Sequence, residues 1–267
     1  MKLRLLDFGS LRADLGWVME AAGVSTHSNE SPETLRRDFQ MLGALIEHPK
    51  HGVILYESGP APNWKELWPE PVQEVFGIVR YEEENRLDKL LEKAGYTIND
   101  VSAIILGHMH LDHAGGLEFF RGMDVPVYAH EEEIKYAFYA IATKQDFGAY
   151  LPHYIDSTFN WKAVHGDEFE IFEGITLYHT PGHTPGMLSM KVDLDNSESF
   201  LFTSDTMFFK ENYYDEQPPG WLIRDMGAWW QSLAKLKSVA TRHNAHVILG
   251  HDGEVFSEYA QKGVYGS

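Results

Sequence analysis

The segment His108-Met109-His110-Leu111-Asp112-His113-Ala114-Gly115-Gly116 is the part of this chain from which its fold and chemistry can be predicted. It places three imidazoles and a carboxylate within six residues of a chain that contains no cysteine. Histidine is the commonest metal ligand in proteins, and a nearby carboxylate lets two cations lie side by side with less repulsion. The segment therefore predicts a metal site.

A histidine cluster can also arise by chance on a solvated surface, since the chain has 14 histidines. This cluster, however, directly follows residues 101–107, VSAIILG, a short apolar run that indicates a buried strand entering a turn. In open α/β sheets, ligand sites lie beyond the carboxyl ends of the strands. We therefore favour a positioned site over a surface cluster.

Three more apolar runs end in a candidate ligand. Residues 174–179, GITLYH, lead into the turn TPGHTPG, which contains His183 and whose Pro and Gly fix the backbone. Residues 199–204, SFLFTS, are followed by Asp205, and residues 245–250, AHVILG, are followed by His251. Four strand ends are thus predicted to converge on one site.

Together these motifs resemble the metallo-β-lactamase superfamily, and over nearly the whole chain the N-acyl homoserine lactonases are its most similar branch. The resemblance implies an α/β fold of the αββα sandwich type and a single domain over residues 1–267. It implies that one metal is bound by His108, His110 and His183, and a second by Asp112, His113 and His251. Asp205 would bridge the two metals.

The resemblance also implies a dinuclear hydrolase that opens a lactone ring, with an N-acyl homoserine lactone as the small-molecule substrate. A hydroxide bridging two divalent cations would attack the carbonyl carbon, because metal binding lowers the pKa of water to about 7. Zinc is the first choice, with Fe, Co or Mn as alternatives. Asp112 could also act catalytically by passing a proton to the leaving alkoxide, or serve as a ligand alone.

Two residues depart from the lactonase pattern. The lactonases usually carry Tyr three residues after the bridging Asp, where this chain has Phe208, whose ring offers no hydrogen-bond donor. Tyr213 or Tyr214 could supply that donor, and Phe208, Tyr213 and Tyr214 are therefore the candidate substrate contacts. Glu57 stands where the family usually has Asp, a residue that orients a metal ligand.

Other functions remain open. A thioester hydrolase of the glyoxalase II type shares much of the ligand set, although the tail 254–267 offers only one lysine for glutathione. A noncatalytic lactone-binding module is a second alternative, but binding alone would not need seven ligands. The zinc β-lactamases that use a cysteine ligand are disfavoured, because the chain has no cysteine.

The composition of the chain argues against some classes of binding partner. The chain has 267 residues, is 43% hydrophobic and carries a net charge of −18, which argues against nucleic acid as a partner. It contains no apolar stretch of 18 residues, so we expect no membrane span. No signal peptide is recognisable at its start, and the cytoplasm is the default location. The oligomeric state stays open, with a homodimer among the options.

Three segments show helical periodicity and are interpreted as packing elements. They are residues 85–95, 131–143, and the stretch after Asp225 that carries a stripe ending at Ala240. Residues 58–71 and 147–161 are aromatic-rich loops, whose rings either line the site or anchor the loops to the core. Residues 212–221 are expected to fold near the metals.

Overall fold

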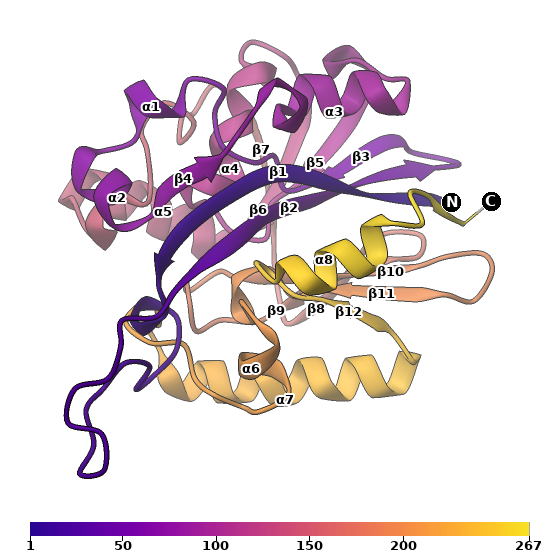
Figure 1. The fold of residues 1–267 in the computed structure, drawn as a ribbon. Helices are drawn as coiled ribbons and strands as arrows, with labels where there is room; N and C mark the ends of the chain where they lie inside the picture. The colour runs from indigo at the N-terminus through magenta and orange to yellow at the C-terminus, as the bar shows by residue number, and fades with distance from the viewer. Residues whose placement is uncertain (267) are drawn as a thin grey trace.

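The computed structural model describes residues 1–266. Two β-sheets pack face to face, and helices cover their outer faces (Figure 1). The layers therefore run helix, sheet, sheet, helix, which is the αββα sandwich that the sequence predicted.

The larger sheet has eight strands, and its parallel part carries the first metal-site segment. Strands β3, β5, β6 and β7 run parallel, whereas β13, β1, β2 and β3 pair antiparallel, and β4 pairs with β1. In spatial order the strands are β13 (Tyr265–Gly266), β1 (Lys2–Asp14), β2 (Arg36–His48), β3 (Gly52–Tyr56), β5 (Val101–Ile105), β6 (Pro126–His130) and β7 (Asn160–Val164), with β4 (Gly77–Arg80) beside β1.

The smaller sheet has five strands and carries the remaining ligand segments. Its strands are antiparallel except for the parallel pair β11 and β12. In spatial order they are β12 (His246–Ile248), β11 (Ser199–Phe202), β10 (Leu188–Asp193), β9 (Ile175–His179) and β8 (Glu168–Phe172).

The helices lie outside the two sheets or at their ends, with α3 and α5 over the larger sheet and α7 over the smaller one (Figure 1). They are α1 (Trp64–Leu67), α2 (Glu70–Val75), α3 (Leu87–Ala94), α4 (Leu111–Ala114), α5 (Glu131–Thr143), α6 (Lys210–Tyr213), α7 (Met226–His243) and α8 (Gly253–Ala260). Across residues 1–266, every helix is too short or too polar to cross a lipid bilayer.

The three predicted helices are confirmed. Helix α3 ends at Gly95, whose φ of 91° is left-handed and suits glycine. Helix α5 spans the predicted range 131–143. Asp225 caps α7 by accepting a hydrogen bond from the backbone N–H of Ala228, 2.8 Å away.

Two apolar cores hold the layers together. One lies between the sheets and extends under α7, and the other lies between the larger sheet and the helices over it. Strand β5 serves both, because Ala103 and Ile105 face the sheet interface while Ile104 faces the helices. Its burial on both faces explains why it reads as a continuous apolar run.

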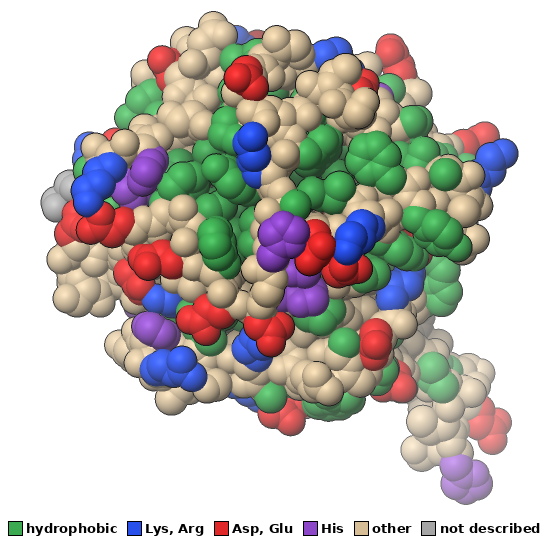
Figure 2. All heavy atoms as spheres, turned by 180° about the vertical axis from the view of Figure 1, so that it is seen from behind, with side chains coloured by type: hydrophobic (Ala, Val, Ile, Leu, Met, Phe, Trp, Pro, Cys, Tyr) green, Lys and Arg blue, Asp and Glu red, His purple; other side chains and the backbone are tan. Residues whose placement is uncertain are grey.

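The surface away from the view of Figure 1 mixes acidic and basic side chains (Figure 2). The segment between β1 and β2, residues 18–35, projects from the body of the molecule (Figures 1 and 2). The candidate ligands lie elsewhere, in the segments that follow β5, β9, β11 and β12. The structure therefore brings strand ends from both sheets to one site.

Candidate metal centre and active site

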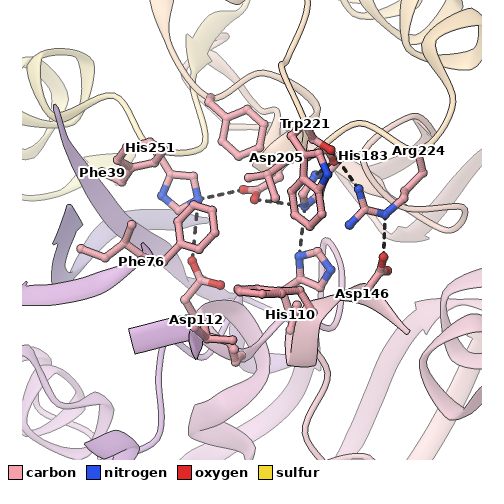
Figure 3. A pocket seen from close by; sticks show the side chains of 17 residues that line it. Phe39, Phe76, His110, Asp112, Asp146, His183, Asp205, Trp221, Arg224 and His251 are labelled. Atoms are coloured by element: carbon pink, nitrogen blue, oxygen red, sulfur yellow. Dashed lines mark hydrogen bonds and ion pairs between the residues drawn. The ribbon is translucent and has the colours of Figure 1, made fainter. Parts of the chain in front are cut away.

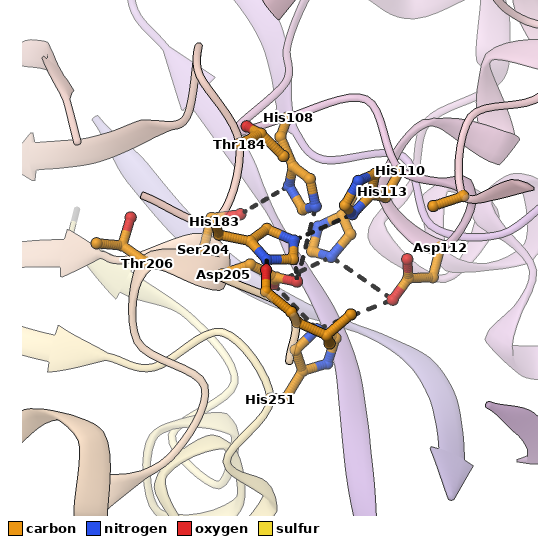
Figure 4. A network of polar contacts seen from close by, with 12 residues as sticks. His108, His110, Asp112, His113, His183, Thr184, Ser204, Asp205, Thr206 and His251 are labelled. Carbon is orange, nitrogen blue, oxygen red and sulfur yellow. Dashed lines mark hydrogen bonds and ion pairs between the residues drawn. The ribbon is translucent and has the colours of Figure 1, made fainter. Parts of the chain in front are cut away.

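Asp205 lies at the centre of the site, and its two oxygens face different histidines (Figure 4). Oδ2 lies 3.4 Å from Nε2 of His183 and 3.6 Å from Nε2 of His108. Oδ1 lies 3.0 Å from Nε2 of His251 and 3.2 Å from Nε2 of His113. The carboxylate therefore stands between two groups of imidazoles.

Each group gains one more side chain from the segment that follows β5. Nδ1 of His110 lies 3.0 Å from Nε2 of His183. Oδ2 of Asp112 lies 3.6 Å from Nε2 of His113 and 3.8 Å from Nε2 of His251. All seven predicted ligands thus lie together, with three side chains on either side of Asp205.

These side chains fit metal ions. Ligands in a tetrahedral zinc site, at about 2.0–2.1 Å from the ion, lie about 3.3 Å apart. The contacts above range from 3.0 to 3.8 Å. Within residues 1–266, buried ligand atoms without a hydrogen-bond partner include Nε2 of His108, Nε2 of His113 and Oδ1 of Asp205. Such atoms are costly to bury, and coordination to a cation would satisfy them.

Hydrogen bonds on the far side of the rings fix their tautomers. Nδ1 of His183 lies 2.8 Å from the backbone oxygen of Leu222, and Nδ1 of His251 lies 3.0 Å from that of Gln40. A carbonyl oxygen only accepts, so each Nδ1 carries the proton and donates it. The lone pair of Nε2 is left pointing into the site, as metal binding requires.

Glu57 supports the second group from behind, as expected. Its Oε1 lies 3.2 Å from Nδ1 of His113 and accepts a 2.9 Å hydrogen bond from the Ser204 hydroxyl. Glu57 and Ser204 both have left-handed backbones, with φ of 61° and 46°, which costs about 1–3 kcal/mol each. A Cβ at Gly107 would meet both side chains, so this position needs glycine.

The pKa shifts of histidines in the two groups run in opposite directions. Burial holds the pKa of His108 and His110 well below the usual range, which keeps both in the neutral form that binds metals. Burial also opposes charge on His113 and His251, but Asp205 outweighs it, so the pKa of both is raised. The second group therefore attracts positive charge.

A pocket opens over the ligands (Figure 3). Asp112, Asp205, His110, His183 and His251 lie in its wall. Most other wall residues are apolar, among them Leu11, Phe39, Val72, Phe76, Phe208 and Trp221. An apolar pocket with a few polar groups is the usual form of a small-molecule site, and here the polar groups are the candidate ligands.

The chain also matches the family model of the metallo-beta-lactamase superfamily over residues 42–251. This span contains all seven candidate ligands. The chain belongs to the metallo-beta-lactamase superfamily.

Its relatives within this superfamily include named lactonases. An N-acyl homoserine lactonase of Bacillus sp is 32% identical over 219 residues, which cover 79% of this chain and 83% of the relative. Another, from Agrobacterium fabrum, is 27% identical over 266 residues, which cover 96% and 95% of the two chains. The sequence thus correctly predicted the branch.

A solved structure agrees with these relatives. It is that of an N-acyl homoserine lactone hydrolase with the product N-hexanoyl-L-homoserine bound at its catalytic metal centre. It matches this chain with a TM-score of 0.79 and 26% identity, covering 96% of this chain and 95% of the other.

The predicted substrate contacts fare differently. Phe208 lines the pocket, and its ring stacks on His251 with centroids 5.6 Å apart. Tyr213 and Tyr214 do not line it: the first is buried in the core between the sheets, and the second is 63% exposed. The structure therefore does not bring the two proposed tyrosine donors to the pocket.

Some aromatic side chains of the predicted loops line the pocket, whereas others pack in the core. Trp64 and Trp68 are buried and pack edge to face, so they anchor residues 58–71 to the core. Phe147 and Trp221, from the other two segments, reach the pocket. Residues 212–221 thus approach the ligands as expected.

Sequence reasoning missed Glu133, on α5. Its fully buried carboxylate accepts hydrogen bonds from the backbone N–H of Met109 at 2.9 Å and of Gly186 at 3.3 Å. It also accepts from the hydroxyls of Tyr150 at 3.0 Å and Thr184 at 2.6 Å. Glu133 thereby joins the two loops that carry His108, His110 and His183. Its helical spacing to the buried Ala137 and Ala140 was the available signal.

Sequence reasoning also missed Arg224 and Asp146, which line one end of the pocket. They lie 78 residues apart in the chain, and Nε of Arg224 donates a 2.6 Å hydrogen bond to Oδ1 of Asp146. Neither stands in a motif, so no signal in the sequence marked them.

Proposed function

We propose that this protein hydrolyses the lactone ring of an N-acyl homoserine lactone with two divalent metal ions, zinc by preference. The observation that carries the proposal is the division of six side chains into two groups around the Asp205 carboxylate, in the wall of an apolar pocket. One ion would be held by His108, His110 and His183, the other by Asp112, His113 and His251, and Asp205 would bridge them.

The bound ions would lower the pKa of water to about 7 and polarise the substrate carbonyl. The protein's own residues do the rest. The ring-nitrogen contacts of His183 and His251 fix the direction of the ligand lone pairs before any metal binds. The apolar wall excludes bulk water from the substrate, which strengthens the charge interactions in the site.

Asp112 is proposed to pass a proton to the ring oxygen that leaves when the lactone opens. Hydrolysis adds the oxygen of water to the acyl carbon and breaks the C–O bond of the ring, whose oxygen must then gain a proton. The side chain of Asp112 is 12% exposed, against 6% for Asp205, and it lies in the pocket wall. Asp112 is therefore the carboxylate better placed to meet the leaving oxygen.

We also propose that residues 1–267 act as one catalytic domain. The segment after β5 belongs to the larger sheet, whereas His183, Asp205 and His251 follow strands of the smaller one. Neither sheet alone provides a complete ligand set for either ion. A cytoplasmic location and the oligomeric state stay predictions.

The first experiment measures metal content and activity together. Protein purified without chelator should contain close to two metal ions per chain. His110→Ala and Asp205→Ala should lose metal and activity, whereas His27→Ala, at an exposed position far from the ligands in the sequence, should retain both. Full activity in metal-free protein would contradict the proposal.

The second experiment identifies the bond. An N-acyl homoserine lactone, a simple lactone, a glutathione thioester and a chromogenic β-lactam should be compared by kcat/KM. We expect turnover chiefly on the lactones. A preference for the thioester would replace the lactonase assignment with the glyoxalase II type and leave the metal centre standing. Tight binding of the lactone without turnover would instead favour a binding module.

A further inference from the structure

The two ends of the pocket carry different side chains (Figure 3). Arg224 and Asp146 lie together at one end, beside His110, while Phe39 and Phe76 lie at the other. Nothing in the proposed hydrolysis uses the Arg224–Asp146 pair, so its presence in the pocket wall calls for a role.

Asp146 holds the guanidinium in place. Its side chain is only 6% exposed, and its Oδ2 is buried and finds no hydrogen-bond partner among the residues that the structure describes. A buried carboxylate without a counter-charge is strongly destabilising, and Arg224 supplies that charge. Asp146 and Phe147 both have left-handed backbones, with φ of 56° and 54°, which are uncommon outside glycine. The loop thus adopts an unfavourable conformation where Asp146 meets Arg224.

Arg224 keeps donors for a ligand. Nε donates to Asp146, and Nη1 donates to the backbone oxygen of Trp221 at 3.1 Å. The guanidinium also lies 5.1 Å from the centre of the half-exposed Trp221 ring. A guanidinium has five N–H groups, so the third nitrogen, Nη2, can donate to a molecule in the pocket.

The position of Arg224 indicates which atom it would meet. Arg224 shares the pocket wall with His110 and His183 (Figure 3), and its backbone N–H donates a 2.8 Å hydrogen bond to the backbone oxygen of Gly182, next to His183. The lactone carbonyl must lie at the ligands themselves. The next acceptor along an N-acyl homoserine lactone is the oxygen of its amide, a few bonds further out.

We infer that Arg224, oriented by Asp146, donates a hydrogen bond to the amide carbonyl oxygen of the acyl group and so selects N-acylated lactones. This inference rests on the proposed function. It assigns Arg224 a specificity role that differs from the role of the tyrosine missing at Phe208, since Phe208 stacks on His251 and Arg224 lies at the Asp146 end.

The test compares two substrates that differ in the amide. N-hexanoyl homoserine lactone and an α-alkyl-γ-butyrolactone of equal chain length are assayed with wild type, Arg224→Gln, Arg224→Lys and Asp146→Asn. Arg224→Gln should lower the preference for the acylated substrate, as the ratio of kcat/KM values, by about 10- to 100-fold, mainly through KM. The substrate preference of Arg224→Lys should lie between those of wild type and Arg224→Gln, because lysine keeps the charge but lacks the planar guanidinium.

The matched control is Arg37→Gln, which removes a partly buried ion pair with Glu211 (2.7 Å) away from this pocket. It should leave the substrate preference unchanged. If Arg224→Gln lowers kcat/KM equally on both lactones, the pair merely fastens two loops and the inference is overturned. If wild type opens neither lactone, the proposed function itself fails, which is a distinct result.

Discussion

Replacing Glu133 with glutamine should weaken metal binding without touching a ligand. Each carboxylate oxygen of Glu133 accepts two hydrogen bonds, one from a backbone N–H and one from a hydroxyl. Glutamine replaces one oxygen with an NH₂ group, which cannot accept. The hydroxyl on that side can rotate and become an acceptor, but the backbone N–H cannot.

The loss of stability in Glu133→Gln can be estimated from these four hydrogen bonds. The longer bond, 3.3 Å from Gly186 N, is the one we expect to be lost. One buried N–H without a partner costs about 1–3 kcal/mol, and the other three bonds lose the strength that a charged acceptor gives. We expect the free energy of unfolding to fall by about 2–4 kcal/mol. Loosening the loops of His108, His110 and His183 should weaken metal binding about 10- to 100-fold, as for other changes behind metal ligands.

Chelator competition gives the metal affinity, and thermal melting of the metal-free protein gives the stability. The neighbouring Glu132→Gln is the matched control, because Glu132 is 46% exposed and pairs with Lys135 at the surface. It should leave both quantities within error of wild type. If Glu133→Gln lowers the melting temperature but keeps metal affinity within about twofold, Glu133 stabilises the fold and does not position the ligand loops.

Three other perturbations test the remaining parts of the site. Phe208→Tyr puts back the hydroxyl that the lactonases usually carry and should raise kcat on lactones by up to about 10²-fold; an unchanged or lower kcat would show that the hydroxyl cannot reach the substrate. Removing metal with a chelator should abolish activity and lower the melting temperature, since an ion at 100 times its Kd adds about 2.7 kcal/mol; a melting temperature that does not respond would contradict the metal site. Burial lowers the pKa of His130 from 6.5 to about 4, so the unfolded chain binds a proton that the folded chain does not, and stability should fall as the pH drops from 6.5 towards 4. His130→Gln should remove about 1–2 kcal/mol of that fall, after allowance for solvent screening, in denaturant melts at the two pH values; an identical pH slope would refute this.

The sequence could predict the ligands because each of them stands directly beyond a strand or in a tight turn. His108, His110, Asp112 and His113 need only local geometry to lie together. His183, Asp205 and His251 follow apolar runs that end at the same edge of the fold. In each case a pattern of a few residues fixed both the element and the side chain beyond it.

Contacts between residues in irregular loops could not be predicted, because no local pattern describes the path of such loops. Arg224 and Asp146 meet across 78 residues, and both lie in loops whose path no periodicity describes. Tyr213 and Tyr214 are close to Asp205 in the chain, yet the first is buried outside the pocket wall and the second is exposed at the surface. Closeness in the sequence therefore predicted which side chains lie together within one turn, but it did not do so for residues further along the chain.

The site also shows why contacts behind the ligands matter as much as the ligands. Each proposed ion would join the larger sheet to the smaller one, so its binding depends on how the two sheets are held relative to each other. Hydrogen bonds make this link without metal, among them those from Ser204 to Glu57, from Nδ1 of His251 to Gln40, and from Thr184 to Glu133. Because they place the ligands before metal binds, less of the binding energy is spent on ordering the loops. Metal affinity should therefore respond to changes at Glu57 and Glu133, although Glu133 touches no ligand side chain.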